Sequence, residues 1–364
     1  METKRFAVLG SGNGARAFCA QIAAKGYQVA MWEPLEATED YLKLKDNPEM
    51  FLSGDINLGG KLSLVTMDIS EAMEGADVIL VVVPSFAHEP IFKKMIPNLQ
   101  DGQHIVMVPG NFSGFRLKKM MKKMGVSKEI SISGTTSMPY ACRISSYNTV
   151  SIYKKKFAMK LGTSPVSQNT EVLNILNNVF KGYVNFIAAE SLLEVDLDNP
   201  NYVVHPFPVL FNFGDIEKNG STYRHYIDGI TPMISEFMER MDEERLMIGK
   251  TLGLTLQDCL SQLKMYYGEN QSKNIYEFVH SPESPYFDLV GQNVKGRYLT
   301  EDVPGVVLPA KLLAEKAGVK APIADLVVET TSFVHNVDYL SKGTTLETLG
   351  IEDKNIEEIK ALAL

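Results

Sequence analysis

Short apolar runs alternate with helical periodicity in the first half of the chain. Strands are expected at residues 5–9, 27–32, 62–66, 76–83, 104–109 and 130–133. Apolar residues at helical spacing follow the first run, over residues 13–25, and a capping-box pattern at 68–71 opens a short helix. Such alternation is typical of a parallel sheet joined by right-handed crossovers. This half of the chain therefore predicts a doubly wound α/β domain of the Rossmann type.

The pattern changes after about residue 145. Two apolar stretches, 149–153 and 157–162, are expected to pair as strands. From about residue 190 onward, apolar positions recur at helical spacing. Helices are expected at 203–217, 229–252, 256–266, 301–317 and 321–337. The sequence thus predicts a Rossmann domain over residues 1–188 and an all-α domain over residues 189–364, and a chain of 364 residues also favours two domains.

A glycine-rich turn joins the first expected strand to the first helix. Its residues are Gly10, Ser11, Gly12, Asn13, Gly14 and Ala15. Gly10 permits the tight turn, Gly12 lets a pyrophosphate approach the backbone, and Ala15 allows close packing of helix on strand. The helix N-terminus supplies amide donors and a dipole that favour phosphate. In this strand–turn–helix context the motif predicts a dinucleotide site.

Glu33 ends the second expected strand, about 20 residues after Gly10, where the ribose-binding acid is expected. Its carboxylate can accept both ribose hydroxyls and would repel a 2′-phosphate, and no arginine follows closely. NAD(H) is therefore favoured over NADP(H). Pro84 and Phe86 follow the fourth strand, at the carboxyl edge of the sheet where dinucleotides bind. Phe86 packs either near the cofactor or in the core.

Two groups of polar residues in the second half carry candidate chemistry. His205 lies four residues after Asn201, so both side chains share a face if the segment is helical. Arg297, Glu301 and Asp302 cluster at an expected loop-to-helix junction. A structural histidine, and an acidic helix cap beside a surface arginine, are the alternative interpretations.

Composition narrows the classes of function. The formal net charge of −8 gives no overall attraction to nucleic acid or to anionic lipid. The short basic runs, Lys118–Lys123 and Lys154–Lys156, are expected on solvated faces. Three widely spaced cysteines indicate neither a disulfide framework nor a zinc site, and no other metal spacing occurs. With no signal peptide or membrane span in the sequence, we expect a cytoplasmic protein.

Beyond these patterns, the chain resembles the opine dehydrogenases, the octopine/nopaline dehydrogenase family, over nearly its whole length. The family often has an acidic residue where Gly134-Thr135 stand here, so the resemblance leaves the substrate open. The motifs that carry it are Gly10-Ser-Gly12-Asn-Gly14-Ala15, Val83-Pro-Ser-Phe-Ala-His88-Glu, Pro109-Gly-Asn-Phe112, Pro139-Tyr-Ala-Cys-Arg143, Asn201-x-x-x-His205-Pro and Arg297-Tyr-x-x-Glu301-Asp302-Val-Pro304.

The resemblance implies NADH-dependent reductive condensation of a 2-keto acid, such as pyruvate, with the amino group of an amino acid. It also implies a catalytic His205–Asp302 dyad, with Arg297 holding a substrate carboxylate. Histidine titrates near neutrality, and a carboxylate partner fixes its tautomer. Asn201 is expected to orient a carbonyl or the nicotinamide amide, and Arg143 either binds a second carboxylate or forms a structural ion pair. The expected partners are these small molecules, and a homodimer is an open alternative to a monomer.

Two other hypotheses remain open. The first is another reductase of the same two-domain plan, of the ketopantoate reductase or glycerol-3-phosphate dehydrogenase type. Those relatives use a catalytic lysine near the substrate. Here Pro109-Gly-Asn-Phe112 stands where a lysine-containing turn is expected. The second is a noncatalytic NAD(H)-binding sensor, which need not keep both His205 and Asp302. NADH consumption with a keto acid and a panel of amino acids separates the three.

Overall fold

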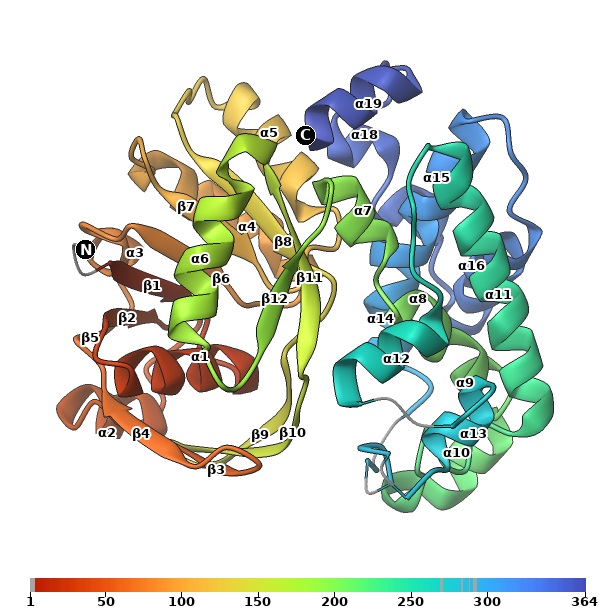
Figure 1. The fold of residues 1–364 in the computed structure, drawn as a ribbon, viewed down its shortest axis with the longest axis horizontal. Coiled ribbons are helices and arrows are strands. Elements are labelled where there is room, and N and C mark those ends of the chain that lie inside the picture. The colour runs from red at the N-terminus through yellow and green to blue at the C-terminus, as the bar shows by residue number, and fades with distance from the viewer. Residues whose placement is uncertain (1–3, 269–270, 283, 288, 291–292) are drawn as a thin grey trace. The chain divides into compact units, whose positions relative to one another are not determined.

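The computed structural model describes residues 4–268, 271–282, 284–287, 289–290 and 293–364 (Figure 1). The chain forms two compact units. The first comprises Met1–Val195 with Ala363–Leu364, and the second Asp196–Leu362. The predicted boundary at residue 188 lies a few residues before this division. Within the described residues, no helix is long and apolar enough to cross a membrane.

A large mixed sheet forms the centre of the first unit. Its strands are β1 (Arg5–Leu9), β2 (Gln28–Trp32), β5 (Leu64–Thr66), β6 (Val78–Val81), β7 (His104–Met107), β8 (Ser131–Thr135), β11 (Ala158–Ser164) and β12 (Asn185–Ala188). The parallel part runs β5-β2-β1-β6-β7-β8, the strand order of doubly wound dinucleotide-binding folds. β11 pairs antiparallel with β8, and β12 pairs parallel with β11. The expectation of a Rossmann-type domain is confirmed, with two added strands of opposite direction.

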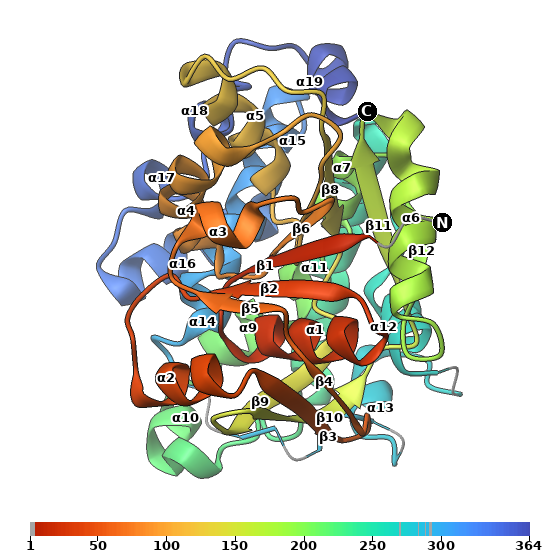
Figure 2. The same cartoon turned by 90° about the vertical axis from the view of Figure 1, so that its left-hand side faces the viewer.

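Helices cover both faces of this sheet, which explains why β6 and β7 are apolar throughout and fully buried. α1 (Asn13–Ala24) and α6 (Asn169–Val179) lie on one face, where the Phe18 ring packs edge-on against Phe180 with centroids 5.3 Å apart. α3 (Ile69–Met73), α4 (His88–Met95) and α5 (Ser113–Lys123) lie on the other face (Figure 2). The remaining helices of this part of the chain are α2 (Glu39–Asp46) and α7 (Leu192–Leu197).

A second, smaller sheet packs against α1, so that this helix lies between two sheets (Figure 2). Its strands are β3 (Glu49–Gly54), β4 (Leu58–Lys61), β9 (Tyr140–Ser146) and β10 (Thr149–Lys155), in the order β4-β3-β10-β9. The predicted pairing of residues 149–153 with 157–162 is wrong. β10 belongs to the small sheet and β11 to the large one, because the chain leaves one sheet for the other at residues 156–157.

The second unit is helical, as predicted, and its described residues contain no β-strand beyond one isolated bridge between Arg224 and Val290. α11 is central and contacts α8, α9, α13, α15 and α16. Its buried side carries apolar residues, with Met238, Met241 and Ile248 fully buried, and also the charged residues Asp242 and Arg245. The helices are α8 (Asn201–Val204), α9 (Pro206–Leu210), α10 (Phe213–Asn219), α11 (Pro232–Thr251), α12 (Cys259–Tyr267), α13 (Ile275–Val279), α14 (Arg297–Thr300), α15 (Leu308–Lys316), α16 (Pro322–His335), α17 (Tyr339–Lys342), α18 (Leu346–Leu349) and α19 (Ile356–Ala363).

Candidate active site

The glycine turn after β1 has the shape that a dinucleotide requires. Gly10 has a φ of +127°, and a Cβ there would lie 2.5 Å from the Val82 carbonyl oxygen. A Cβ at Gly12 would meet nothing within 4 Å, so the space above this residue is open to a pyrophosphate. Ala15, in the first turn of α1, is fully buried. The residues present therefore fit the dinucleotide that the sequence predicts.

Glu33 lies at the end of β2 and is held beside this turn. It is buried, it accepts a hydrogen bond from the Ser11 hydroxyl, and its Oε1 accepts from the Leu35 amide at 3.0 Å. Arg16 braces the same turn, because its guanidinium donates to the Ser11 carbonyl at 2.8 Å and to the Tyr147 carbonyl at 2.6 Å. Sequence reasoning missed Ser11 and Arg16, since neither role is visible before the turn is folded.

The other predicted cofactor and substrate residues of the first unit have different surroundings. The Asn13 side chain accepts a hydrogen bond from the Ile144 amide at 2.8 Å, so it ties the turn to β9. Pro84 precedes a short 3-10 helix at the end of β6. Phe86 is 75% exposed, so the alternative of a core role for it is wrong. Arg143 is exposed on β9, where its guanidinium donates to the Cys142 carbonyl at 3.0 Å.

His205 and Asp302 meet in the second unit although they are far apart in the sequence. His205 stands at the junction of α8 and α9, and Asp302 directly precedes a π-helical turn, Val303–Val307. His205 Nδ1 lies 2.7 Å from Asp302 Oδ2, and both side chains are buried. Asn201 donates from Nδ2 to Asp302 Oδ1 at 3.3 Å. Two of the predicted residues, His205 and Asn201, thus converge on the carboxylate of a third, Asp302.

Aromatic residues enclose this pair, and no sequence pattern assigned them to the site. Tyr298 stacks on the His205 ring, with centroids 3.6 Å apart and planes inclined by 10°. Tyr226 Oη lies 3.2 Å from His205 Nε2, so both ring nitrogens have partners. When Nδ1 carries the proton toward Asp302, the Tyr226 hydroxyl donates to Nε2. His225 packs edge-on against the same ring. Hydrophobic periodicity does not predict such contacts, because they join segments that are far apart in the sequence.

Burial controls protonation in this cluster. It raises the pKa of the Asp302 carboxyl to about 7, against the opposing effects of the Asn201 hydrogen bond and the Arg297 charge. It also raises the pKa of Tyr226 well above its ordinary value, so this hydroxyl stays protonated. Burial, with the neighbouring His205, lowers the pKa of His225 to about 3 and keeps that ring neutral. Because Tyr226 stays protonated and His225 stays neutral, Asp302 is the group beside His205 that can exchange a proton with it near pH 7.

Arg297 lies at the start of α14 and pairs with Glu301, one turn away. Its guanidinium lies 2.6 Å from Glu301 Oε2. The arginine side chain is 70% exposed, whereas the glutamate side chain is 7% exposed. The structure thus connects Arg297 to the dyad through its charge and through the α14 segment, and not through a direct hydrogen bond.

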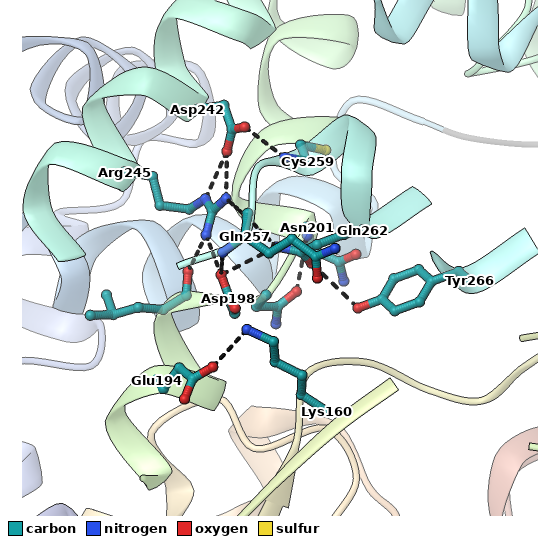
Figure 3. A network of polar contacts seen from close by, with 12 residues as sticks. Lys160, Glu194, Asp198, Asn201, Asp242, Arg245, Gln257, Cys259, Gln262 and Tyr266 are labelled. Atoms are coloured by element: carbon teal, nitrogen blue, oxygen red, sulfur yellow. Dashed lines mark hydrogen bonds and ion pairs between the residues drawn. The ribbon is translucent and has the colours of Figure 1, made fainter. Parts of the chain in front are cut away.

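A buried ionic network fixes the segment that leads into α8 (Figure 3). Arg245, on α11, has a fully buried side chain and donates to Asp198 Oδ1 at 2.8 Å and to Asp242 Oδ1 at 2.7 Å. The same guanidinium donates to the Leu197 carbonyl at 2.9 Å and to the Gln257 carbonyl at 2.6 Å. Because Asp198 lies just before α8, this network anchors the backbone that carries Asn201 and His205.

A chain that combines a doubly wound unit carrying a dinucleotide turn with a helical unit carrying a buried histidine–aspartate pair has the features of a nicotinamide-dinucleotide-dependent oxidoreductase. Two family models match the chain. Residues 188–335 match the NAD/NADP octopine/nopaline dehydrogenase alpha-helical domain, and residues 5–130 match the NAD-dependent glycerol-3-phosphate dehydrogenase N-terminus. The opine dehydrogenase of Arthrobacter sp. (strain 1C) is 33% identical over 355 residues, which is 96% of each chain.

Solved structures share the fold. An octopine dehydrogenase with NADH and L-arginine has a TM-score of 0.78 at 22% identity, and its complex with NADH and pyruvate has a TM-score of 0.75 at 21% identity. Both comparisons cover 98% of each chain. A yersinopine dehydrogenase with NADP+ has a TM-score of 0.73 at 15% identity and covers 99% of this chain and 98% of that one.

This chain belongs to the opine dehydrogenase family. It is an oxidoreductase that acts on CH–NH donors, and it uses a nicotinamide dinucleotide for the reductive condensation of a keto acid with an amino acid. The resemblance drawn from the sequence motifs is confirmed at the level of family, fold and reaction.

Proposed function

We propose that His205 moves the protons of this condensation, that Asp302 stabilises its charged form, and that NADH is the preferred reductant. The buried contact of 2.7 Å between His205 Nδ1 and Asp302 Oδ2 carries this proposal. A fixed, carboxylate-paired imidazole is suited to both giving and taking protons near neutral pH.

The reaction needs protons at defined stages. The neutral amine of the amino acid attacks the keto carbon, and the resulting carbinolamine loses its hydroxyl as water, which leaves a protonated imine (an iminium ion). His205 accepts a proton from the ammonium form of the amino acid and returns it to the departing hydroxyl. Bound NADH would supply the hydride that reduces the carbon of this iminium ion, and the product would be a secondary amine with two carboxylates. Asp302 favours the imidazolium form between these steps, because an opposite charge within hydrogen-bond distance stabilises it.

Tyr226 completes the arrangement on the other side of the ring. Its neutral hydroxyl, 3.2 Å from Nε2, can donate to the neutral imidazole and accept from the protonated one. Tyr298, stacked on the same ring, limits its rotation. Asn201 holds the second oxygen of Asp302, so its proposed role moves from the substrate to the dyad.

Two arginines remain candidates for substrate carboxylates. The exposed guanidinium of Arg297 has a planar fork that suits a carboxylate, and its contact with Glu301 keeps it on the α14 segment that adjoins the dyad. Arg143, exposed on β9, is the second candidate. A carboxylate grip acts in the ground state and the transition state alike, so we expect Arg297→Ala to raise KM more than it lowers kcat.

NADH is proposed over NADPH because of Glu33. Its buried carboxylate lies at the end of β2, beside the glycine turn, where a ribose 2′-phosphate would meet a like charge. The nearby cation, Arg16, donates to two backbone carbonyls and braces the turn.

The deciding experiment follows NADH absorbance with 2-keto acids and amino acids, alone and in pairs. Consumption that requires both substrates supports the proposal. Consumption with keto acid alone would indicate a hydroxy-acid dehydrogenase, and binding of NADH without turnover would indicate a sensor. His205→Ala should lower kcat by about 10²–10⁴. His104→Ala, at the start of β7 in the first unit, where the ring contacts Ser131, is the control and should retain activity.

A further inference from the structure

Lys156 lies in the short connection between β10 and β11 and is buried, with 7% of its surface exposed. The expectation of a solvated face for Lys154–Lys156 is therefore wrong for this lysine, because the chain turns it inward as it passes from one sheet to the other. Its Nζ donates to Ser137 Oγ at 2.5 Å, and its backbone amide donates to the Pro139 carbonyl at 2.9 Å.

This contact lies at the carboxyl edge of the parallel sheet. Ser137 follows β8, which ends at Thr135, by two residues. The next residue, Met138, packs on the dinucleotide turn, since a Cβ at Gly14 would lie 2.2 Å from its Cε. Ligands of open α/β sheets bind outside the carboxyl ends of the strands. The Lys156 ammonium group thus contacts Ser137, the residue directly before Met138, and Met138 packs against the turn that is proposed to receive the dinucleotide.

The chemistry of the pair suits an anion. A serine hydroxyl that accepts from an ammonium group still has its own hydrogen to donate, so the two side chains together offer N–H and O–H donors. Burial disfavours the charged form of the Lys156 amine and lowers its pKa to about 7. An incoming carboxylate would stabilise the charged form, because it supplies an opposite charge within hydrogen-bond distance.

We propose that Lys156 and Ser137 form a subsite for the α-carboxylate of one of the two substrates. The proposal rests on the proposed function, since that reaction brings two carboxylates to the dinucleotide edge of the sheet. The 2-keto acid and the amino acid share this chemistry, and the experiment below separates them. The subsite is built from the first unit and is distinct from the Arg297 and Arg143 candidates.

The first unit contains a natural control. Lys118, on α5, donates to Ser164 Oγ at the same distance of 2.5 Å. Ser164 pairs with Ile132 in the register of β11 and β8, so this second lysine–serine contact lies toward the amino edge of the sheet. Burial lowers the pKa of Lys118 as well, to about 8. The Lys156–Ser137 and Lys118–Ser164 pairs thus have the same chemistry but lie at opposite edges of the parallel sheet.

The test compares Lys156→Met with Lys118→Met. Each variant and the wild type, saturated with NADH, are titrated with pyruvate and separately with L-alanine, and binding is followed by nicotinamide fluorescence. Lys156→Met should raise the Kd of one probe by about 10- to 100-fold, the usual worth of a hydrogen bond to a charged group. The affected probe identifies the substrate. Ser137→Ala should weaken the same probe several-fold, and Lys118→Met should leave both within twofold.

The affinity for NADH should be unchanged in all variants, which excludes a folding defect as the cause. Equal affinity of wild type and Lys156→Met for both probes would overturn the subsite, as would a wild type that binds neither probe. A general loss in which Lys118→Met weakens the same probe equally would overturn it too. Failure of the proposed function is seen separately, as the absence of turnover with every substrate pair in the NADH absorbance panel.

Discussion

Replacement of Asp302 by asparagine keeps the shape of the side chain and removes its charge. In the wild type, a carboxylate oxygen lies 2.7 Å from His205 Nδ1, and the side chains of both residues are less than 10% exposed. An asparagine can offer either an oxygen or an NH₂ group at that position. If it offers the NH₂ group, Nδ1 must accept, and the ring proton moves to Nε2, which faces Tyr226.

The size of the effect follows from this contact. A hydrogen bond to a charged group contributes about 1.5–3 kcal/mol, and loss of that amount from the transition state lowers the rate about 10- to 150-fold. Burial of the pair places the loss near the upper limit. The inverted tautomer removes proton transfer at Nε2 in addition, so we expect kcat for Asp302→Asn to fall by about 10²–10⁴.

Steady-state NADH oxidation measures the change in kcat, and ¹⁵N NMR of the histidine ring reports the tautomer. Asp338→Asn, at the N-cap of α17, is the control, because asparagine caps helices as well as aspartate does. The affinity for NADH should remain at its wild-type value, since the glycine turn and Glu33 lie in the other unit. If kcat stays within threefold of wild type, Asp302 does not act through the His205 proton and the mechanism is wrong.

Three further predictions concern the cofactor and the stability of the fold. Glu33→Ala should lower the ratio of kcat/KM with NADH to kcat/KM with NADPH. An unchanged ratio would refute the role of this carboxylate in discriminating against the 2′-phosphate. Arg245→Met should lower the free energy of unfolding in urea by about 3–5 kcal/mol, because it leaves buried carboxylates without their cation; a loss below 1 kcal/mol contradicts this. The pKa of Lys156 falls from 10.5 to about 7 on folding. Between these pH values the folded protein therefore binds fewer protons than the unfolded chain, and the free-energy cost of burying the charged ammonium group is greatest below pH 7. Lys156→Met should therefore raise the free energy of unfolding at pH 7 by on the order of a few kcal/mol, and this gain should vanish toward pH 10.5.

Local signals in the sequence were sufficient for the parts of the fold that depend on neighbours along the chain. The strand–turn–helix unit at Gly10 forms where expected, and α11, α12 and α16 lie close to the predicted helices. The expected helix at 203–217 is divided into α8, α9 and α10, and the short helices α13, α17, α18 and α19 were not predicted. The β3–β4 hairpin was missed because it is short and contains Gly54, Gly59 and Gly60, which weaken an alternating pattern. The wrong pairing of residues 149–153 with 157–162 has another cause. Adjacent strands usually pair, and nothing local shows that the chain changes sheets between them.

The site divides in the same way. Glu33 was predictable because its distance from Gly10 along the chain is a property of the fold. The resemblance to a family pointed to His205 and Asp302, whose contact no local pattern could show. Tyr226 and Tyr298 were not predictable, since the segments that carry them meet His205 only in the folded unit. Lys156 was misjudged because a run of three lysines is usually solvated, and only the turn between two sheets buries the third.

The position of α1 between two sheets has a consequence for synthesis of the protein. The hairpin β3–β4 finds its partner strand only when β10 has been made, roughly a hundred residues later in translation. Until Lys155 leaves the ribosome, β3 has one unpaired edge, and Met50 and Leu52, buried in the finished protein, have incomplete cover. A chain that stops before Tyr140 keeps the glycine turn and most of the parallel sheet, yet exposes a strand edge and one side of its first helix. We expect such a truncated chain to aggregate rather than to persist as a smaller dinucleotide-binding domain.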